Sequence, residues 1–212
     1  MVELNLMRFL ATALSTFSLF AGIAAAQEDV NKLNRKEAQE GWILLFDGKT
    51  LKGWEARPTS VPGSKGDWSV QNGALLCGGT VPSWLSTNDS FSDYRLTLEF
   101  RGPEKVNSGV FLRSQKEGQP HITGYELQIW DYQPAGYLTG SLVGSVKAEP
   151  VKILPGQWNK YDITAKGDHF TVVLNGKTVL DASDDKHSSG LIGFQCQKDQ
   201  RIEFRNIKLK RP

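Results

Sequence analysis

The sequence predicts an all-β sandwich of two antiparallel sheets, with one short helix near the N-terminal end. Several segments alternate apolar and polar residues, Asn-Gly pairs separate apolar runs, and 21 of the 212 residues are glycine. Alternation with a period of two is typical of half-buried strands, and many short strands separated by turns favour a sandwich or jelly roll. No repeat of fixed period and no linker rich in Pro or Ser divides the chain, which indicates a single β domain over residues 41–212.

The first 26 residues have the pattern of a secretory signal peptide. Arg8 precedes an apolar run over residues 9–23, and three alanines at 24–26 stand before a polar segment. A basic start, an apolar centre and a small-residue cleavage site define such a signal, and the run is short for a membrane span. We therefore expect residues 1–26 to be removed and the protein to be exported to the periplasm or the extracellular space, without membrane attachment. A buried N-terminal helix is the alternative.

Residues 27–40 should form an extension that carries the one predicted helix. Asn34 is placed to cap this helix, Glu37 stands at the capping-box position, and Gly41 can end it. A capping Asn and a Glu three residues later satisfy free backbone N–H groups of the first turn, and glycine is the usual residue just past a helix end. The helix should therefore stop where the β domain begins.

Tight turns and alternation mark the strands that follow. Asn72-Gly73 and Asn175-Gly176 each separate two apolar runs, and Asn-Gly tolerates the positive φ of a two-residue hairpin turn. Further strands are predicted at residues 42–46, 94–100, 109–113, 125–130 and 201–209. Long loops in compact domains are usually either functional or disordered. We expect the long irregular stretch 131–155 to be a folded surface loop beside a functional site. A second irregular stretch, 56–67, is expected to be a rim loop.

Charge and cysteine content limit the function classes. The net charge is +2 with both signs interspersed, so the chain has no basic surface of the kind that binds nucleic acid. Cys77 and Cys196 lie far apart in apolar, strand-like runs. In an exported protein they can form one disulfide, and two buried thiols fit the sequence equally well.

Most catalytic signatures are missing from the sequence. It contains no nucleophile elbow, no phosphate-binding loop and no dinucleotide-binding glycine motif. The three histidines are scattered without zinc-site spacing. No cofactor is indicated, and the metal ligands are unknown, although scattered carboxylates and carbonyls are compatible with a divalent metal such as calcium.

One predicted sheet face combines polar and aromatic side chains. If Leu127 and Ile129 point into the core, their neighbours in the same segment point outward, and the segment at 109–113 should do the same. The outward residues would be Phe111, Arg113, Glu126, Gln128 and Trp130. Indole rings and charged groups suit a carbohydrate. A solvated face with an Arg–Glu cross-strand pair is the alternative.

Paired carboxylates for ordinary glycoside hydrolysis are not found on this face. Asp131 follows Glu126 on the opposite face or past the strand end, which does not give the close carboxylate pair of glycosidases. Trp84 can line a site or fill the core, and the core is favoured. His121 lies in a loop just before the Glu126 strand, where it can carry protons or simply face solvent.

Six segments carry short motifs in an order that spans nearly the whole β domain. They are residues 41–54 (with LFDGKTLKGW), 107–113 (NSGVFLR), 125–131 (YELQIWD), 156–159 (GQWN), 174–176 (LNG) and 204–207 (FRNI). Together they resemble the 3-keto-disaccharide hydrolase family, whose fold is similar to the concanavalin A-like lectin/glucanase jelly roll. Asn107 and Gln195 lie in resembling segments and are added as substrate-binding candidates. Gln197 departs from the pattern, since a histidine is common there.

The resemblance implies an enzyme that cleaves 3-keto-glycosides. A ketone at C3 of a sugar acidifies the hydrogen at C2, so a base can remove that proton and the glycosidic oxygen at C1 can leave. On this basis Glu126 or Asp131 is expected to transfer protons, Arg113 to contact the enolate or a hydroxyl, and Gln128 and Trp130 to position the sugar. A carbohydrate-binding module without catalysis and a structural or partner-binding exported domain remain as alternatives.

Overall fold

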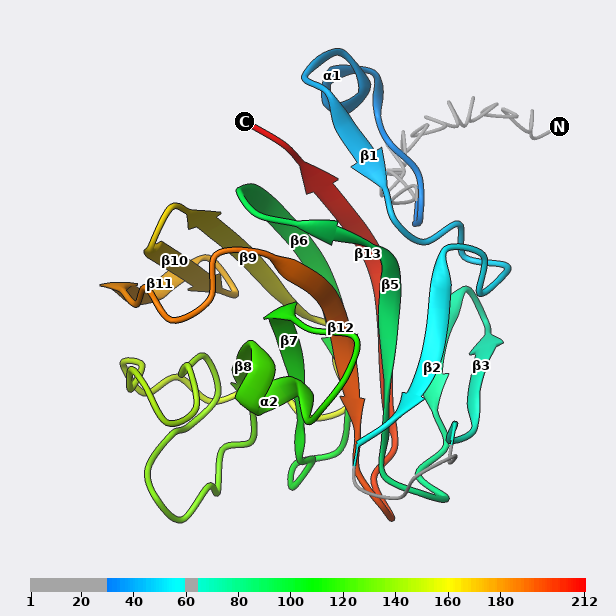
Figure 1. Cartoon of the computed structure of the whole chain (residues 1–212). Coiled ribbons are helices and arrows are strands. Elements are labelled where there is room, and N and C mark those ends of the chain that lie inside the picture. Colours follow the sequence, from blue (N-terminus) through cyan, green and yellow to red (C-terminus); the bar gives the residue numbers. More distant parts are fainter. Residues whose placement is uncertain (1–29, 60–64) are drawn as a thin grey trace, which may run out of the picture.

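Two antiparallel sheets face each other in the computed structural model, which describes residues 30–59 and 65–212 (Figure 1). This is the jelly-roll sandwich expected from the alternating segments. The predicted signal peptide at residues 1–26 lies outside the described residues, as do residues 27–29. In the described part of the chain, no helix is long and apolar enough to cross a bilayer.

The larger sheet has eight strands in the order β11-β10-β9-β6-β13-β4-β3, with β1 paired beside β13. Its strands are β1 (Trp42–Leu44), β3 (Trp68–Gln71), β4 (Ala74–Cys77), β6 (Tyr94–Arg101), β9 (Asn159–Lys166), β10 (His169–Leu174), β11 (Lys177–Ser183) and β13 (Ile202–Lys210). The smaller sheet has five strands in the order β2-β5-β12-β7-β8. They are β2 (Trp54–Pro58), β5 (Ser83–Phe91), β7 (Ser108–Ser114), β8 (Tyr125–Ile129) and β12 (Gly190–Cys196).

The predicted helix and both Asn-Gly turns are confirmed. Helix α1 (Arg35–Gln39) has Asn34 as its cap, and both hydrogen bonds of the capping box to Glu37 are present. Asn72 and Asn175 have φ of 50° and 49°, and the glycines that follow them are also at positive φ. Each pair therefore closes a two-residue hairpin, β3–β4 and β10–β11.

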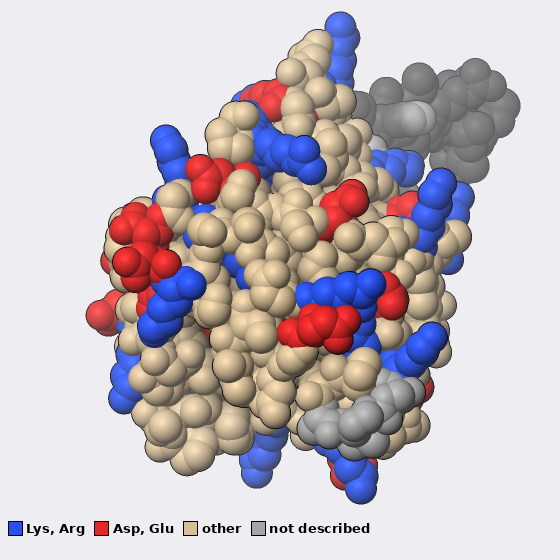
Figure 2. All heavy atoms as spheres, viewed as in Figure 1, with Lys and Arg blue, Asp and Glu red and all other residues tan. Residues whose placement is uncertain are grey.

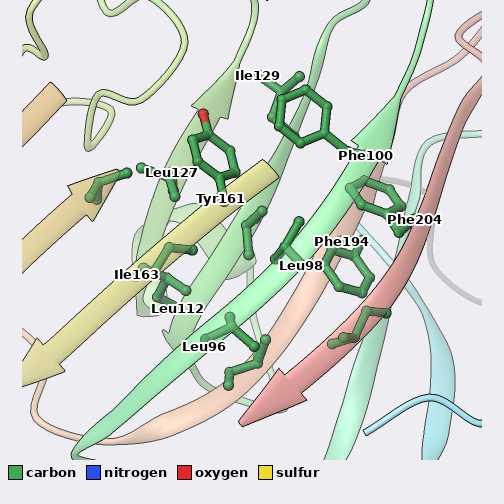
Figure 3. Packing of buried hydrophobic residues seen from close by; sticks show 14 of the residues in the cluster. Leu96, Leu98, Phe100, Leu112, Leu127, Ile129, Tyr161, Ile163, Phe194 and Phe204 are labelled. Carbon is green, nitrogen blue, oxygen red and sulfur yellow. The ribbon is translucent and has the colours of Figure 1, made fainter. Parts of the chain in front are cut away.

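The core lies between the two sheets and follows the alternation of their strands. Leu96, Leu98 and Phe100 of β6 are at most 1% exposed. They face residues of β7 and β8 from the other sheet, Leu112 and Leu127 among them, as Figure 3 shows. Because burying one such side chain contributes about 1.5–3 kcal/mol, this repeated apolar set fixes which face of each strand points inward.

A disulfide joins the two sheets. Cys77 of β4 and Cys196 of β12 are bonded, with their Cα atoms 5.6 Å apart and a sequence separation of 119. Of the two alternatives left open by the sequence, the structure therefore has the disulfide. Cys196 is the last residue of β12 and stands between Gln195 and Gln197, so the bond anchors the end of the strand beside both glutamines.

The long irregular stretch 131–155 covers the free edge of β8. Backbone hydrogen bonds join Gln128 to Ser141 and Gly140, and Val143 to Glu126, while Leu142 forms an isolated bridge with Leu127. This pairing satisfies backbone groups that an edge strand would otherwise expose. The second irregular stretch was predicted too long at its start, because residues 56–58 belong to β2, where they pair with β5. Residues 60–64 lie outside the described residues.

Candidate active site

Side chains that point away from the core line the outer surface of the five-stranded sheet. We call this surface the open face and define it by Arg57 of β2, Trp84 of β5, Phe111 of β7, Glu126 and Gln128 of β8 and Gln195 of β12. Strands β7 and β8 are neighbours, as the predicted grouping required, with Phe111 opposite Glu126 and Gly109 opposite Gln128. On the other side of β7, Gly193 of β12 stands opposite Phe111.

A pocket of about 310 Å³ opens on this face. It is lined by Thr59, Pro82, Asn107, Phe111, Gln119, His121, Glu126, Gln128, Trp130, Gln195 and Gln197. These residues come from five separate segments of the chain, which only the sheet order β2-β5-β12-β7-β8 brings together. Figure 2 shows that the surface over α2 (Pro120–Thr123) and the neighbouring end of β7 carries few charged groups.

Glu126 is the buried carboxyl group of the pocket. Its residue is 7% exposed, and burial raises the pKa of Glu126 to about 7, while the side chain of Gln195 offsets part of the shift. The carboxyl group fits against the sheet because Gly109 has no side chain. A Cβ at position 109 would stand 2.9 Å from Cγ and 3.0 Å from Oε1 of Glu126. At neutral pH this group therefore exists in both protonation states, which suits a proton carrier.

Gln195 presents an acceptor that the protein leaves unused. The residue is 6% exposed, and its Oε1 atom is buried without a hydrogen-bond partner among the described residues. Buried polar groups are nearly always paired, because an unpaired one costs about 1–3 kcal/mol. A hydroxyl group of a bound ligand would supply the missing donor.

Helix α2 brings His121 to the rim of the pocket. Pro120 is the first residue of this short helix, a position that suits proline. The Gln119 carbonyl accepts hydrogen bonds from the backbone N–H groups of Ile122 and Thr123. Partial burial lowers the pKa of His121 below 6.5. Its imidazole is therefore mainly neutral at pH 7, and it is the second titratable side chain that lines this pocket.

The remaining glutamine and asparagine side chains make the pocket polar without adding charge. Gln128 is 3% exposed, and its Oε1 accepts from the backbone N–H of Ile129 at 3.0 Å. Asn107 is fixed through its own backbone N–H, which donates to Gln200 at 3.0 Å. Gln197 follows Cys196 and lines the pocket one step beyond Gln195.

The orientation predicted for Arg113 was wrong. It is 1% exposed and does not line the pocket. Its guanidinium donates to the carbonyls of Ser92, Gly167 and His187, contacts the carboxylate of Asp93, and lies 5.1 Å from the Phe170 ring. Arg113 therefore holds together loops at one end of the sandwich.

A bulge in β7 causes this reversal. Phe111 pairs with Gly193 and Ser114 pairs with Leu191, so Leu112 and Arg113 together stand opposite a single residue of β12. An extra residue interrupts the alternation of the strand, and Arg113 adopts the left-handed backbone conformation at φ 55°. A strict alternation counted from Phe111 therefore could not predict the orientation of Arg113.

Asp131 and Trp84 also lie outside the pocket lining. Asp131 follows the end of β8, and its carboxylate accepts from the Thr139 hydroxyl and, at 3.0 Å, from the backbone N–H of Ile153. These hydrogen bonds therefore hold together the two ends of the loop 131–155. Trp84 is 1% exposed and packs edge-on against Phe111, in a small apolar cluster with Leu191 that is separate from the main core.

Four lining residues were not among the predicted site residues: Thr59, Pro82, Gln119 and Gln197. Extending the alternation of β12 by one step from Gln195 would have found Gln197. The other three lie in segments whose place beside the sheet depends on tertiary structure. Over residues 30–59 and 65–212, no group of three or more His, Cys, Asp or Glu side chains is arranged to hold a metal ion.

Comparison with known proteins identifies related sequences and folds. The family described as 3-keto-alpha-glucoside-1,2-lyase-like domain matches residues 41–210. A 3-keto-disaccharide hydrolase of Bacteroides thetaiotaomicron is 27% identical over an alignment of 230 positions, gaps included, which covers 81% of this chain and 78% of the relative.

Two solved structures share the fold. A protein of Parabacteroides distasonis assigned as a glycosyl hydrolase matches with a TM-score of 0.74 at 22% identity, covering 86% of this chain and 99% of its own. A carbohydrate-binding module of Bacillus subtilis matches with a TM-score of 0.58 at 18% identity, covering 74% and 94%. One sandwich thus serves proteins described as a hydrolase and as a sugar-binding module.

Proposed function

The chain belongs to the family of 3-keto-alpha-glucoside-1,2-lyase-like domains, and from this we propose that it cleaves glycosidic bonds of 3-keto-glycosides, 3-keto-disaccharides among them. The observation that supports this proposal most directly is the buried carboxyl group of Glu126 in a polar pocket, with a pKa raised to about 7. A hydrolase-type enzyme also agrees with the name of the relative from Bacteroides thetaiotaomicron.

The proposed reaction proceeds by elimination and hydration. Removal of the C2 proton of the 3-keto sugar gives an enolate, whose electrons then form the C1–C2 double bond as the bond from C1 to the glycosidic oxygen breaks. The leaving oxygen takes up a proton. Water then adds across the double bond, with its oxygen on C1 and a proton on C2, so the net reaction is hydrolysis. This route needs one proton carrier, in contrast to the two carboxylates of most glycosidases.

Glu126 is the base in this proposal. Its ionised form accepts the C2 proton, and the resulting carboxylic acid can donate the same proton to the departing oxygen. A pKa close to the working pH allows both steps with one group. Asp131, which was the other candidate for this role, is occupied with Thr139 and Ile153 away from the pocket lining.

Neutral donors take the place that was predicted for Arg113. The amide groups of Gln128, Gln195 and Asn107 line the pocket and can bind the enolate oxygen and the sugar hydroxyls. Trp130 is partly exposed and supplies apolar surface for the sugar ring, whereas the Phe111 side chain, which also lines the pocket, is fully buried. His121, neutral at pH 7, can accept or donate a hydrogen bond at the rim.

Export of the protein and a requirement for a metal remain predictions within this proposal. The signal-like segment at residues 1–26 supports action in the periplasm or outside the cell. A divalent metal such as calcium was compatible with the sequence, and we assign no step to it.

The experiment is to incubate the protein with 3-keto-trehalose or with trehalose, each with and without EDTA, and to follow released sugar. Cleavage of the keto sugar alone is the expected result, and EDTA sensitivity would reveal a metal. Equal cleavage of both sugars would contradict the elimination route, since trehalose has no ketone to acidify C2.

A carbohydrate-binding protein without catalysis is the second candidate. Gln197, where a histidine is common in the family, lines the pocket, and the module from Bacillus subtilis shares the fold. Saturable binding of 3-keto-trehalose by calorimetry, with neither sugar cleaved, would favour this function.

A further inference from the structure

A second pocket lies on the same open face. It has a volume of about 410 Å³ and is lined by Glu55, Arg57, Asn88, Ser90, Ser114, Gln115, Lys116 and Leu191. We infer that this pocket is a second sugar subsite, so that the protein binds a glycoside of more than one ring with its reactive unit at Glu126. The inference deepens the proposed function and rests on it for the identity of the first sugar.

Three elements border both pockets, so the two lie side by side along the sheet. Strand β2 supplies Arg57 to the second pocket and continues to Thr59 in the first. The connection from β7 to β8 supplies Lys116 to the second and His121 to the first. Strand β12 also borders both pockets, with Gln195 lining the first and Leu191 lining the second.

The spacing of the pockets suits a ligand longer than one ring. Leu191 and Gln195 are four residues apart on one strand, which corresponds to roughly 13 Å along the sheet. The apolar cluster of Trp84, Phe111 and Leu191 lies between them, since Phe111 lines the first pocket and Leu191 the second. Trp84 fits there because a Cβ on Gly193 would stand only 2.5 Å from its ring.

Arg57 supplies fixed donors in the second pocket. Its residue is 8% exposed, and its guanidinium donates to Ser86 Oγ at 2.8 Å and to Glu55 Oε2 at 2.6 Å. A guanidinium has five N–H donors. These are its two side-chain partners in the described part of the chain, so three N–H groups remain for a ligand.

The other groups of the second pocket match the hydroxyls of a sugar. Glu55 is half exposed and offers carboxylate acceptors beside the Arg57 donors. Asn88 and Ser90 are exposed and can both donate and accept. Figure 2 shows acidic and basic side chains next to one another over β12, β5 and β2. Such adjacent donors and acceptors can bind neighbouring hydroxyl groups of one ring.

Calorimetry with ligands of increasing length tests the inference. The ligands are 3-keto derivatives of methyl α-glucoside, maltose and maltotriose, each oxidised on its non-reducing ring, and the protein carries Glu126→Gln to prevent turnover. We expect the dissociation constant to fall at least tenfold from the shortest to the longest ligand. The same constant for all three, or no binding of any of them, would overturn the inference.

Two substitutions in the second pocket should remove this gain. Ser90→Trp fills the pocket from an exposed strand position, and Glu55→Ala removes the acceptors. Both should leave the affinity for the methyl glucoside within twofold. Ser183→Trp, at an exposed position of β11 in the other sheet, is the matched control and should retain the gain. If the gain survives Ser90→Trp in a folded protein, the second pocket is not the subsite.

Cleavage assays separate this inference from the proposed function. If wild-type protein cleaves none of the three keto sugars and the length-dependent gain is still lost with Ser90→Trp, the proposed reaction fails and the second subsite stands. Cleavage of all three with equal kcat/KM, together with equal affinities, would leave the proposed reaction intact and reject the subsite.

Discussion

The side chain of Glu126 lies directly against the backbone of Gly109 on the neighbouring strand. A Cβ at position 109 would come within 3.0 Å of Glu126 Oε1 and within 3.2 Å of the Leu127 carbonyl oxygen. The position of the carboxyl group thus depends on the absence of a side chain at residue 109.

Substituting Gly109 by Ala should therefore impair the reaction. The carboxyl group would have to move by several tenths of an ångström, and small displacements of a reacting group are costly. We expect kcat/KM for 3-keto-trehalose to fall at least about tenfold. The thermal unfolding midpoint is measured in parallel, and unchanged kinetics in a folded Gly109→Ala protein would show that the Glu126 position is not critical.

Removing the proposed base should nearly abolish activity. Glu126→Gln keeps the shape of the side chain and loses proton transfer, which contributes about 10²–10⁴-fold to rate. In the wild type, kcat/KM should rise with pH through the Glu126 pKa of about 7, because the base acts in its ionised form. Glu149→Gln, at an exposed loop position, is the control and should behave as the wild type. Near-normal rates with Glu126→Gln would remove this residue from the mechanism.

The same carboxyl group should make the protein less stable as pH rises. Glu126 ionises near its ordinary value of 4.5 in the unfolded chain and at about 7 in the folded protein. Between these values the unfolded state loses its proton first, so the free energy of unfolding falls as pH rises from about 4.5 to about 7. The full loss is about 3 kcal/mol.

Chemical denaturation of wild type and Glu126→Gln at pH 5 and pH 8 measures this effect. The substituted protein should gain stability relative to the wild type at pH 8, by about 3 kcal/mol, and much less at pH 5. An equal difference at both pH values would show that Glu126 is not buried with a raised pKa.

The disulfide should contribute strongly to stability. The bond joins residues with a sequence separation of 119. For a loop of this length the chain-entropy relation gives a stabilisation of about 4–5 kcal/mol. Urea unfolding of the double substitution Cys77→Ala with Cys196→Ala should show a loss of that order. Reductant should destabilise the wild type and leave the double variant unchanged, and a wild type insensitive to reductant after unfolding would contradict the prediction.

Arg113 should affect stability and leave the chemistry largely intact. Its guanidinium donates to three backbone carbonyl groups, and each such charge-assisted bond is worth about 1.5–3 kcal/mol. Arg113→Gln should lower the free energy of unfolding by about 3 kcal/mol. At a temperature where the variant is folded, the pH dependence of kcat/KM should match that of the wild type. A displaced pH profile would indicate that Arg113 acts on the pocket.

Local pattern was sufficient for much of the fold and for four of the eleven residues that line the pocket. Alternation in residues 94–100 and 125–130 predicted which side chains enter the core, because a strand turns successive side chains to opposite faces. Asn34 with Glu37 and the two Asn-Gly pairs predicted the helix and the hairpins, since those backbone conformations depend on neighbouring residues alone. The grouping of Phe111, Glu126, Gln128 and Trp130 followed from the same period.

Tertiary structure decided what depends on contacts between distant strands. Arg113 turned away from the pocket because β7 carries one more residue than its partner β12, and the register of two strands is set by their pairing. Cys77 and Cys196 form a disulfide because β4 and β12 lie in opposite sheets and bring these two residues to the same end of the sandwich. The raised pKa of Glu126 also arises in the folded chain, from the segments that enclose the carboxyl group and exclude water. The sequence by itself determined which residues share a face wherever a strand keeps its alternation, and the folded structure decided where a bulge interrupts that alternation and which faces enclose a site.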